Sequence, residues 1–292
     1  MSATPLDASV IVPTYGDGAS LSRCLAALAA QTHAAERFEV LVVDNEEVPR
    51  PAPRLPPNAR WLHEPSPGSY AARNRALREA RGALLAFTDA DCVPADDWVA
   101  AGVAALGRAP EVARLAGAVD LMESGPVTAA TLHERVFGFR QERLADRGTS
   151  VTANMWARRA VFDAIGPFDP ALRSGGDVAW GLAAQARGFA VRYAPEVRVS
   201  HPSRDAAALV AKARRVYAGE FTLAGSGAGP RPLTLLRGLA LLKPPVRRMR
   251  DALATGTLSG AEPLLVAWME SRLRLAQYAE HVRLTFGGAP PR

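Results

Sequence analysis

Short apolar runs alternate with helical stretches over the first two hundred residues of the chain. The runs are apolar at nearly every position and predict strands at residues 9–13, 38–44, 83–87 and 112–121. Apolar residues at helical spacing, such as Leu21, Leu25 and Leu28, predict helices at residues 20–31, 69–81, 95–107 and 177–188. Strands without polar alternation are buried on both faces, so the pattern predicts an α/β fold with a mostly parallel sheet flanked by helices.

Polar residues follow three of these strands at the point where each strand ends. They are Thr14-Tyr15, Asp44 and Asp89, and a proline-rich loop over residues 45–58 follows the second. In open α/β sheets, ligands bind outside the carboxyl ends of the strands. We therefore expect these residues to border a ligand site.

The amino-acid composition of the chain changes near residue 204. It becomes rich in alanine, arginine and leucine and predicts helices at residues 205–219, 233–256 and 262–284. Residues 204–292 hold 14 of the 35 basic and 6 of the 29 acidic residues, a net charge of +8, whereas residues 1–203 have a net charge of −2. The sequence thus predicts a catalytic domain over residues 1–203 and a basic helical extension over residues 204–292.

Composition sets the class of protein. With 292 residues, 48% hydrophobic and 22% charged, the chain has the balance of a globular protein. No run of 18 apolar residues indicates a membrane span, and the first residues lack the basic and apolar regions of a secretory signal. Two cysteines are too few for a disulfide scaffold, so we expect a cytoplasmic protein.

Several nucleotide-binding and catalytic motifs are missing from the sequence. It contains no complete G-x-G-x-x-G, no P-loop, no G-x-S-x-G and no H-E-x-x-H. These absences disfavour a Rossmann dinucleotide site, a P-loop NTPase, an α/β-hydrolase and a zinc protease.

The two carboxylates of Thr88-Asp89-Ala90-Asp91 come directly after a strand. Carboxylates at positions i and i+2 of a turn can converge on one hard cation, which in turn neutralises a diphosphate. The alternative is that Asp89 starts a turn and Asp91 is simply solvated.

Several motifs in the same order resemble family 2 glycosyltransferases of the GT-A fold. The resemblance spans about residues 8–203 and leaves the tail outside. Its motifs are Ser9-Val-Ile-Val-Pro-Thr-Tyr15, Glu39-Val-Leu-Val-Val-Asp-Asn45, Gly68-Ser-Tyr-Ala-Ala-Arg-Asn74, Ala80-Arg-Gly82, Phe87-Thr-Asp-Ala-Asp91, Asn154 with Arg158-Arg159, Gly166-Pro-Phe-Asp169 and Gly175-Gly-Asp-Val178.

The resemblance implies an inverting hexosyltransferase that uses a nucleotide-diphosphate sugar and Mn²⁺ or Mg²⁺. It implies Asp177 as the catalytic base that takes the proton of the acceptor hydroxyl, with a plain helix cap as the alternative. It also implies Asp91 and His201 as metal ligands. The nucleotide-binding residues that it implies are Pro13, Thr14, Tyr15, Asp44, Arg73 and Asp89.

The chain departs from the family pattern beside the expected base. Gly176, Ala179 and Ala183 stand where relatives often carry charged residues. This keeps open a second hypothesis, a catalytically degenerate scaffold or sugar-nucleotide sensor. Two residues, Trp180 and Asn154, are candidates for the acceptor side, with the protein core as the alternative place for Trp180.

The basic tail suggests a partner. An apolar segment over residues 233–242 is followed by Lys243, Arg247, Arg248 and Arg250, as in a helix that lies on a membrane surface. The alternative is a helix packed on the catalytic domain. We expect the acceptor to be a glycan, a lipid-linked glycan or a small molecule, and the enzyme to take part in bacterial cell-envelope glycan synthesis. We also expect peripheral contact with the inner face of the membrane. No nucleic-acid partner is expected.

Overall fold

The structure is a computed structural model that describes residues 5–16, 18–223, 236, 238–243, 246–254 and 256–288. The chain divides into two compact units. The sheet unit comprises Met1–Asp120, Arg140–Ala171 and Gly176–His201, and the helical unit comprises Leu121–Phe139, Leu172–Gly175 and Pro202–Arg292. A domain boundary after residue 203 stays a prediction.

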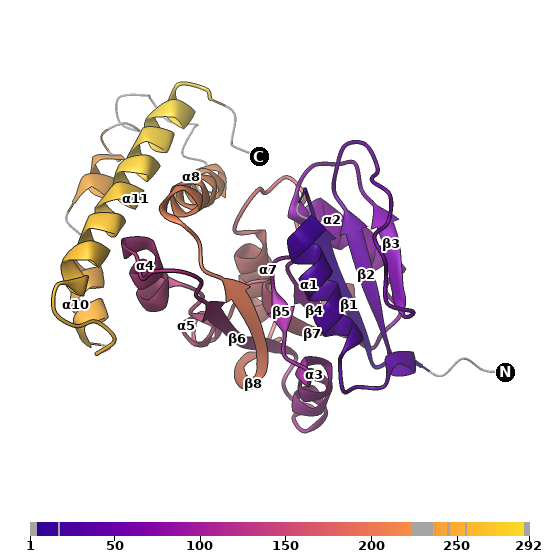
Figure 1. Cartoon of the computed structure of the whole chain (residues 1–292). Helices are drawn as coiled ribbons and strands as arrows, with labels where there is room; N and C mark the ends of the chain where they lie inside the picture. The colour runs from indigo at the N-terminus through magenta and orange to yellow at the C-terminus, as the bar shows by residue number, and fades with distance from the viewer. Residues whose placement is uncertain are drawn as a thin grey trace. The chain divides into compact units, whose positions relative to one another are not determined.

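The described chain has an eight-stranded sheet in the order β3-β2-β1-β4-β7-β6-β8-β5 (Figure 1). The strands are β1 Ala8–Thr14, β2 Phe38–Asp44, β3 Ala59–His63, β4 Leu84–Thr88, β5 Val93–Pro94, β6 Arg114–Met122, β7 Asn154–Arg158 and β8 Val191–Pro202. The helices of the sheet unit are α1 Gly18–Ala29, α2 Ser69–Glu79, α3 Trp98–Gly107, α5 Gln141–Ala145, α6 Arg159–Ile165 and α7 Gly176–Ala186, with a short 3-10 helix, η1 Ala35–Arg37.

Strands β3, β2, β1 and β4 form the parallel part of the sheet. Every residue of β1, β2 and β4 is buried, as expected for strands covered on both faces. Helix α2 packs on β1 and β2. These strands confirm the α/β class that the apolar runs predict.

The other part of the sheet is antiparallel, because β7 pairs in the opposite direction with both β4 and β6, and β5 does so with β8. The sheet is therefore mixed. The core beside β7 holds Trp98 and Trp156, whose rings meet edge to face with centroids 5.0 Å apart. The ring of Trp156 also fills the place of a side chain at Gly102, where a Cβ atom would come within 2.5 Å of it.

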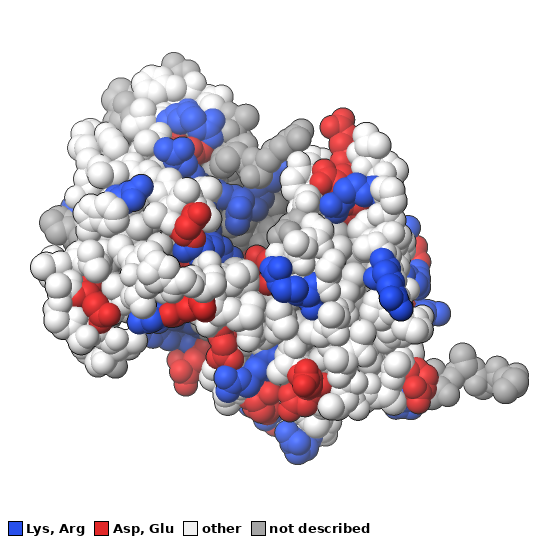
Figure 2. Space-filling view, viewed as in Figure 1, with Lys and Arg blue, Asp and Glu red and all other residues white. Residues whose placement is uncertain are grey.

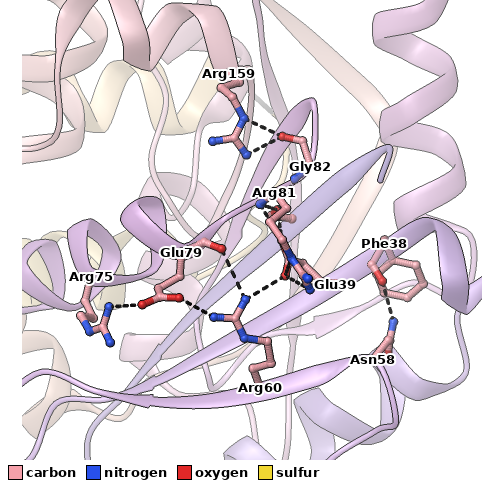
Figure 3. A network of polar contacts seen from close by, with 10 residues as sticks. Phe38, Glu39, Asn58, Arg60, Arg75, Glu79, Arg81, Gly82 and Arg159 are labelled. Atoms are coloured by element: carbon pink, nitrogen blue, oxygen red, sulfur yellow. Dashed lines mark hydrogen bonds and ion pairs between the residues drawn. The ribbon is translucent and has the colours of Figure 1, made fainter. Parts of the chain in front are cut away.

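A network of polar contacts around the buried carboxylate of Glu39 ties the amino ends of the central strands together (Figure 3). The carboxylate of Glu39, at the start of β2, accepts hydrogen bonds from Ser9 and from the backbone and guanidinium of Arg81. Ser9 in turn accepts from the backbone of Gly82 at 2.8 Å. A Cβ atom at Gly82 would lie 2.4 Å from the backbone nitrogen of Ser9, so only glycine fits there. The motif residues Glu39, Arg81 and Gly82 thus hold β1, β2 and β4 in place.

The helical unit packs around one long helix. Its elements are α4 Ala129–Phe137, α8 Ala206–Leu223, the 3-10 helix η3 Leu239–Leu242, α10 Val246–Ala254 and α11 Glu262–Thr285. Helix α11 contacts α4, α8, η3 and α10 (Figure 1). Ala130, Leu209, Met269 and Leu273 form a shared apolar core. None of the helices described is long and apolar enough to cross a membrane.

The continuous helix expected over residues 233–256 is wrong where the structure describes it. Lys243 is extended, with φ −64° and ψ 139°, and separates η3 from α10. It precedes a proline, which disfavours the helical conformation of the residue before it. The residues 233–235, 237, 244–245 and 255 of that prediction lie outside the described residues.

Candidate active site

The expected site residues come together at the carboxyl edge of the parallel strands. Thr14 and Asp44 end β1 and β2 and are partners in the strand register. Asp89 follows the last residue of β4, which is the neighbour of β1 on its other side. The three strand ends thus adjoin one another, as the edge position of ligand sites in such sheets requires.

The first pair of strand ends combines buried and exposed groups. Pro13 and Thr14 are buried, and the Thr14 hydroxyl has no hydrogen-bond partner. The side chain of Tyr15 is 64% exposed. Asp44 is fully buried, and its carboxylate accepts hydrogen bonds from the backbone and the guanidinium of Arg50 at 2.8 and 2.9 Å. A nucleotide that contacts Asp44 must therefore share this carboxylate with Arg50.

Arg73 on α2 is buried, not on a solvated helix face. Its guanidinium forms an ion pair with Asp89 at 2.5 Å. The same guanidinium lies over the ring of Tyr70, 5.6 Å from the ring centroid. A buried Arg beside a partly exposed carboxylate leaves one side of that carboxylate open to a ligand.

Asp91 and His201 form the second polar pair. The carboxylate of Asp91 is 39% exposed and lies 3.2 Å from Nε2 of the buried His201, which belongs to β8. A carboxylate oxygen and an imidazole nitrogen are both common metal ligands. Among the residues that the structure describes, no group of three or more His, Cys, Asp and Glu could hold a metal ion. A metal at this pair would take its other ligands from a bound molecule or water.

The two cysteines of the chain, Cys24 and Cys92, are free and buried. Burial raises the pKa of Cys24 to about 12, and burial also raises the pKa of Cys92 well above its usual range. The charges of Asp89 and Asp91 add to both shifts. Both thiols are therefore protonated at neutral pH when no metal is bound.

Asp177 is buried in the first turn of α7 and is held by several donors. The Tyr70 hydroxyl donates to Oδ1 at 2.9 Å, and the backbone nitrogen and hydroxyl of Thr152 donate to Oδ2 at 3.1 and 3.4 Å. Burial, followed by the charge of Asp177, raises the pKa of Tyr70, so the phenol stays protonated and donates. The carboxylate therefore has a fixed orientation.

Gly176 makes this arrangement fit. A Cβ atom at residue 176 would lie 2.7 Å from the ring of Tyr70, so the ring occupies the space of a side chain at that position. The hydrogen bond from Tyr70 to Asp177 thus depends on the absence of a side chain at Gly176.

Contacts within the sheet unit connect the two ends of the candidate site. Asp89 pairs with Arg73, Arg73 lies over Tyr70, and Tyr70 donates to Asp177. The residues expected on the donor side and the expected base are therefore linked through two side chains of one helix, α2.

Two expected acceptor-side residues lie in the core instead. Trp180 is buried, stacks on Phe162 with centroids 4.1 Å apart and donates from Nε1 to the carbonyl of Gly166. It offers no open ring face to an acceptor.

Asn154 is also buried and uses its whole amide inside the protein. Its nitrogen donates to the carbonyls of Ala118 and Val197, both at 2.8 Å, and its oxygen accepts from Trp98. These contacts make Asn154 a structural bridge from β7 to β6, β8 and α3, because both amide N–H donors and one acceptor position of its oxygen are used inside the protein.

Three residues of this site are not expected from the sequence. Tyr70 lies in a motif that resembles the family but carries no expected role there. Arg50 lies in the proline-rich loop over residues 45–58, and Thr152 lies in a segment without a recognised pattern. One feature of the sequence points to the pair of Tyr70 and Gly176: position 176 lacks the charged residue that relatives often carry there.

Comparison with known proteins identifies the family. A family model described as glycosyl transferase family 2 matches residues 9–166. The glycosyltransferase AglE of Haloferax volcanii is 34% identical over 229 residues, which cover 76% of this chain and 75% of AglE.

Solved structures share the fold. The mannosyltransferase PcManGT from Pyrobaculum calidifontis, in complex with GDP-Man and Mn²⁺, has a TM-score of 0.61 and 19% identity over 98% of this chain and 90% of its own. S. aureus TarS 1-349, in complex with UDP, has a TM-score of 0.53 and 15% identity over 98% of this chain and 93% of its own. The strand order, the site at the sheet edge and these matches agree: the fold is the GT-A fold, and the chain is a glycosyltransferase that belongs to glycosyl transferase family 2.

Proposed function

We propose that the chain is an inverting, metal-dependent enzyme that moves a sugar from a nucleoside-diphosphate donor to an acceptor hydroxyl. The observation that carries this proposal is the set of contacts from Asp89 through Arg73 and Tyr70 to Asp177. It joins a donor side and a base side within one site, as a displacement at the anomeric carbon requires.

The donor side uses the edge of the parallel strands. Pro13, Thr14, Tyr15 and Asp44 border the nucleotide, and Arg73 and Asp89 bind its ribose or phosphate part. The buried, unpartnered hydroxyl of Thr14 supports this assignment, because such a group gains a partner when a polar ligand binds. The complexes of the structural neighbours with GDP-Man and UDP support a nucleotide-linked donor.

The pair Asp91 and His201 binds the divalent ion. Oxygen and imidazole ligands suit Mn²⁺ better than Mg²⁺, which takes mainly oxygen ligands. When bound, the ion supplies positive charge that stabilises the departing diphosphate.

Asp177 acts as the general base. Its carboxylate accepts the proton of the acceptor hydroxyl while the acceptor oxygen forms a bond to the anomeric carbon and the bond to the diphosphate breaks. Attack opposite to the leaving group inverts the anomeric configuration. Tyr70 and Thr152 orient the carboxylate, because each donates to one of its oxygens. Base assistance of this kind contributes about 10²–10⁴ to the rate.

The acceptor side belongs to the same proposal. We assign residues 204–292 to an extension that brings the enzyme to a lipid-linked glycan at the inner face of the membrane, within cell-envelope glycan synthesis. The net charge of +8 over these residues supports contact with anionic lipid.

A thermal-shift panel tests the proposal. UDP-, GDP-, dTDP- and CMP-sugars are added with Mn²⁺, with Mg²⁺ and without either, because a ligand that binds only the folded state raises its stability. We expect one base to raise the midpoint of unfolding, and to do so mainly with the metal, and the same donor to release nucleotide when an acceptor is present. Donor binding that does not depend on the metal would contradict the role of Asp91 as a metal ligand. Binding without any release of nucleotide favours the degenerate scaffold instead.

A further inference from the structure

Two of the three acidic residues of helix α11 point inward, and the third, Glu262, is half-buried at its first position. Glu270 is buried and contacts Nε2 of His133 at 3.0 Å and Nε of Arg274 at 3.0 Å. Glu280 is buried as well and pairs with Arg283. The polar pairs that usually cover the outer face of a surface helix lie here on its packed face.

The outer face of α11 is apolar and cationic. Its exposed large side chains recur at helical spacing and include Leu264, 74% exposed, and Trp268, 53% exposed. The full set is Leu264, Leu265, Trp268 and Leu275, followed by Phe286 just after the helix. The guanidinium of Arg272 lies over the ring of Trp268, 4.8 Å from its centroid. No acidic side chain of α11 is exposed.

The same chemistry recurs on two elements that contact α11. Leu239 and Leu242 of η3, and Val246 and Leu253 of α10, are exposed. Lys243 and Arg250 are exposed among them. In the view of Figure 2, the surface over α10 and α11 is mostly uncharged and is interrupted by single charged side chains. Arg247 and Arg248, which the sequence analysis singled out, have side chains outside those that the structure describes.

We infer that this surface, formed by the outer faces of α11, η3 and α10, binds an anionic lipid bilayer. Exposed leucines and a tryptophan enter the boundary between headgroups and acyl chains, and the interspersed cations bind anionic headgroups. A two-fold dimer through this face would bring the cations of one copy against those of the other. An anionic bilayer complements the face in both respects.

This inference deepens the proposed function, since it rests on the proposed contact with a membrane. It places that contact on α11 and its neighbours, whereas the sequence pointed to residues 233–250. An enzyme held in this way works next to acceptors anchored in the same bilayer.

Vesicle co-sedimentation of the full chain tests the inference. We expect binding to vesicles that contain phosphatidylglycerol, weaker binding at high salt and little binding to phosphatidylcholine alone. The double variant Trp268→Ser, Leu275→Ser loses about tenfold or more in affinity, because both side chains are already exposed and their loss affects the bilayer contact and not the core. Arg272→Gln weakens binding and reduces its salt dependence.

The matched control replaces exposed apolar residues elsewhere. Val127 and Leu182 are exposed but do not belong to α11, η3 or α10, so Val127→Ser, Leu182→Ser should bind vesicles like the native chain. Equal binding by the Trp268, Leu275 variant and the native chain would overturn the inference. Equal binding of the native chain to both kinds of vesicle would also overturn it. The same holds if the native chain forms a dimer that the Trp268, Leu275 variant does not form, and binds no vesicles.

The donor panel separates the two proposals. If the chain does not bind vesicles but still binds the donor with the metal and transfers the sugar, only the proposed lipid-binding surface is wrong. If vesicles bind and no donor does, the surface stands and the proposed chemistry is wrong.

Discussion

Single residues decide whether the carboxylate of Asp177 can act on an acceptor. It is buried, yet its two oxygens accept from different parts of the chain, Tyr70 of α2 and Thr152 of the segment before β7. Such fixed hydrogen bonds hold a base at a defined angle.

Replacement of Asp177 by asparagine tests the base directly. Asp177→Asn keeps the size of the side chain but accepts no proton, so we expect kcat to fall by about 10²–10⁴ while donor affinity stays unchanged. Steady-state kinetics and the donor thermal shift measure the two effects. Asp163→Asn on the exposed face of α6 is the matched control. Full turnover in Asp177→Asn would remove the assignment.

Tyr70 and Gly176 give a second test of the same residue. Tyr70→Phe keeps the ring but removes the hydrogen bond to Asp177, and we expect kcat to fall about tenfold with little change in donor KM. Gly176→Ala should have a similar effect, because its Cβ atom must displace the ring. Tyr193→Phe and Gly107→Ala are the controls; a Cβ atom at residue 107 meets nothing within 4 Å. If both test variants turn over like the native enzyme, Tyr70 does not position the base.

At the scale of elements, opposite ends of the same strands have different roles. The carboxyl ends of β1, β2 and β4 carry the candidate site, and their amino ends carry the network around Glu39. Motif residues that resemble the family thus fall into two groups, one for chemistry and one for holding the strands.

Loss of the charge at Glu39 tests this division. The carboxylate is buried and accepts hydrogen bonds from Ser9, Arg60 and Arg81, so Glu39→Gln weakens charge-assisted hydrogen bonds at a buried position and should cost about 2 kcal/mol of unfolding free energy. Urea denaturation measures the loss. The exposed Glu36→Gln on η1 should change stability little. A Glu39→Gln protein as stable as the native chain would show that the network is not structural.

Elements differ in how well the sequence predicts them. Strands β1, β2 and β4 are predicted to within a residue or two, since continuous apolar runs leave few alternatives to a buried strand. Strand β7 is not, because it is short, has polar residues at both ends and depends on pairing with distant β4 and β6. The same applies to Asn154 and Trp180, whose place in the core depends on neighbours that no local pattern reveals.

At the scale of the whole molecule, the expected site residues come from segments between residues 13 and 201 that the fold of the sheet unit brings together. The strand ends could be predicted, because the carboxyl ends of parallel strands share one edge. The contacts of Arg50, Tyr70 and Thr152 could not, because they depend on how loops and helices pack.

The proposed metal site would join distant segments of the chain, and a variant of Asp91 tests it. Asp91 and His201 are far apart in sequence and 3.2 Å apart in space. Asp91→Ala should abolish the extra stabilisation that Mn²⁺ gives with the donor, a shift of up to about 2.7 kcal/mol at a ligand concentration 100 times Kd. Differential scanning fluorimetry with and without Mn²⁺ measures it, and the exposed Asp97→Ala is the control. An unchanged Mn²⁺ effect in Asp91→Ala would contradict the metal site.

The shared space of the Tyr70 ring and residue 176 also has an evolutionary consequence. Only one of the two positions can carry a bulky group, since the ring already fills the volume next to the helix start. A lineage that gains a side chain at the second position must first give up the aromatic ring at the first, and must then orient its base in another way. The two positions should therefore change together among relatives, so that a member with a side chain at the second position is expected to lack the phenol at the first.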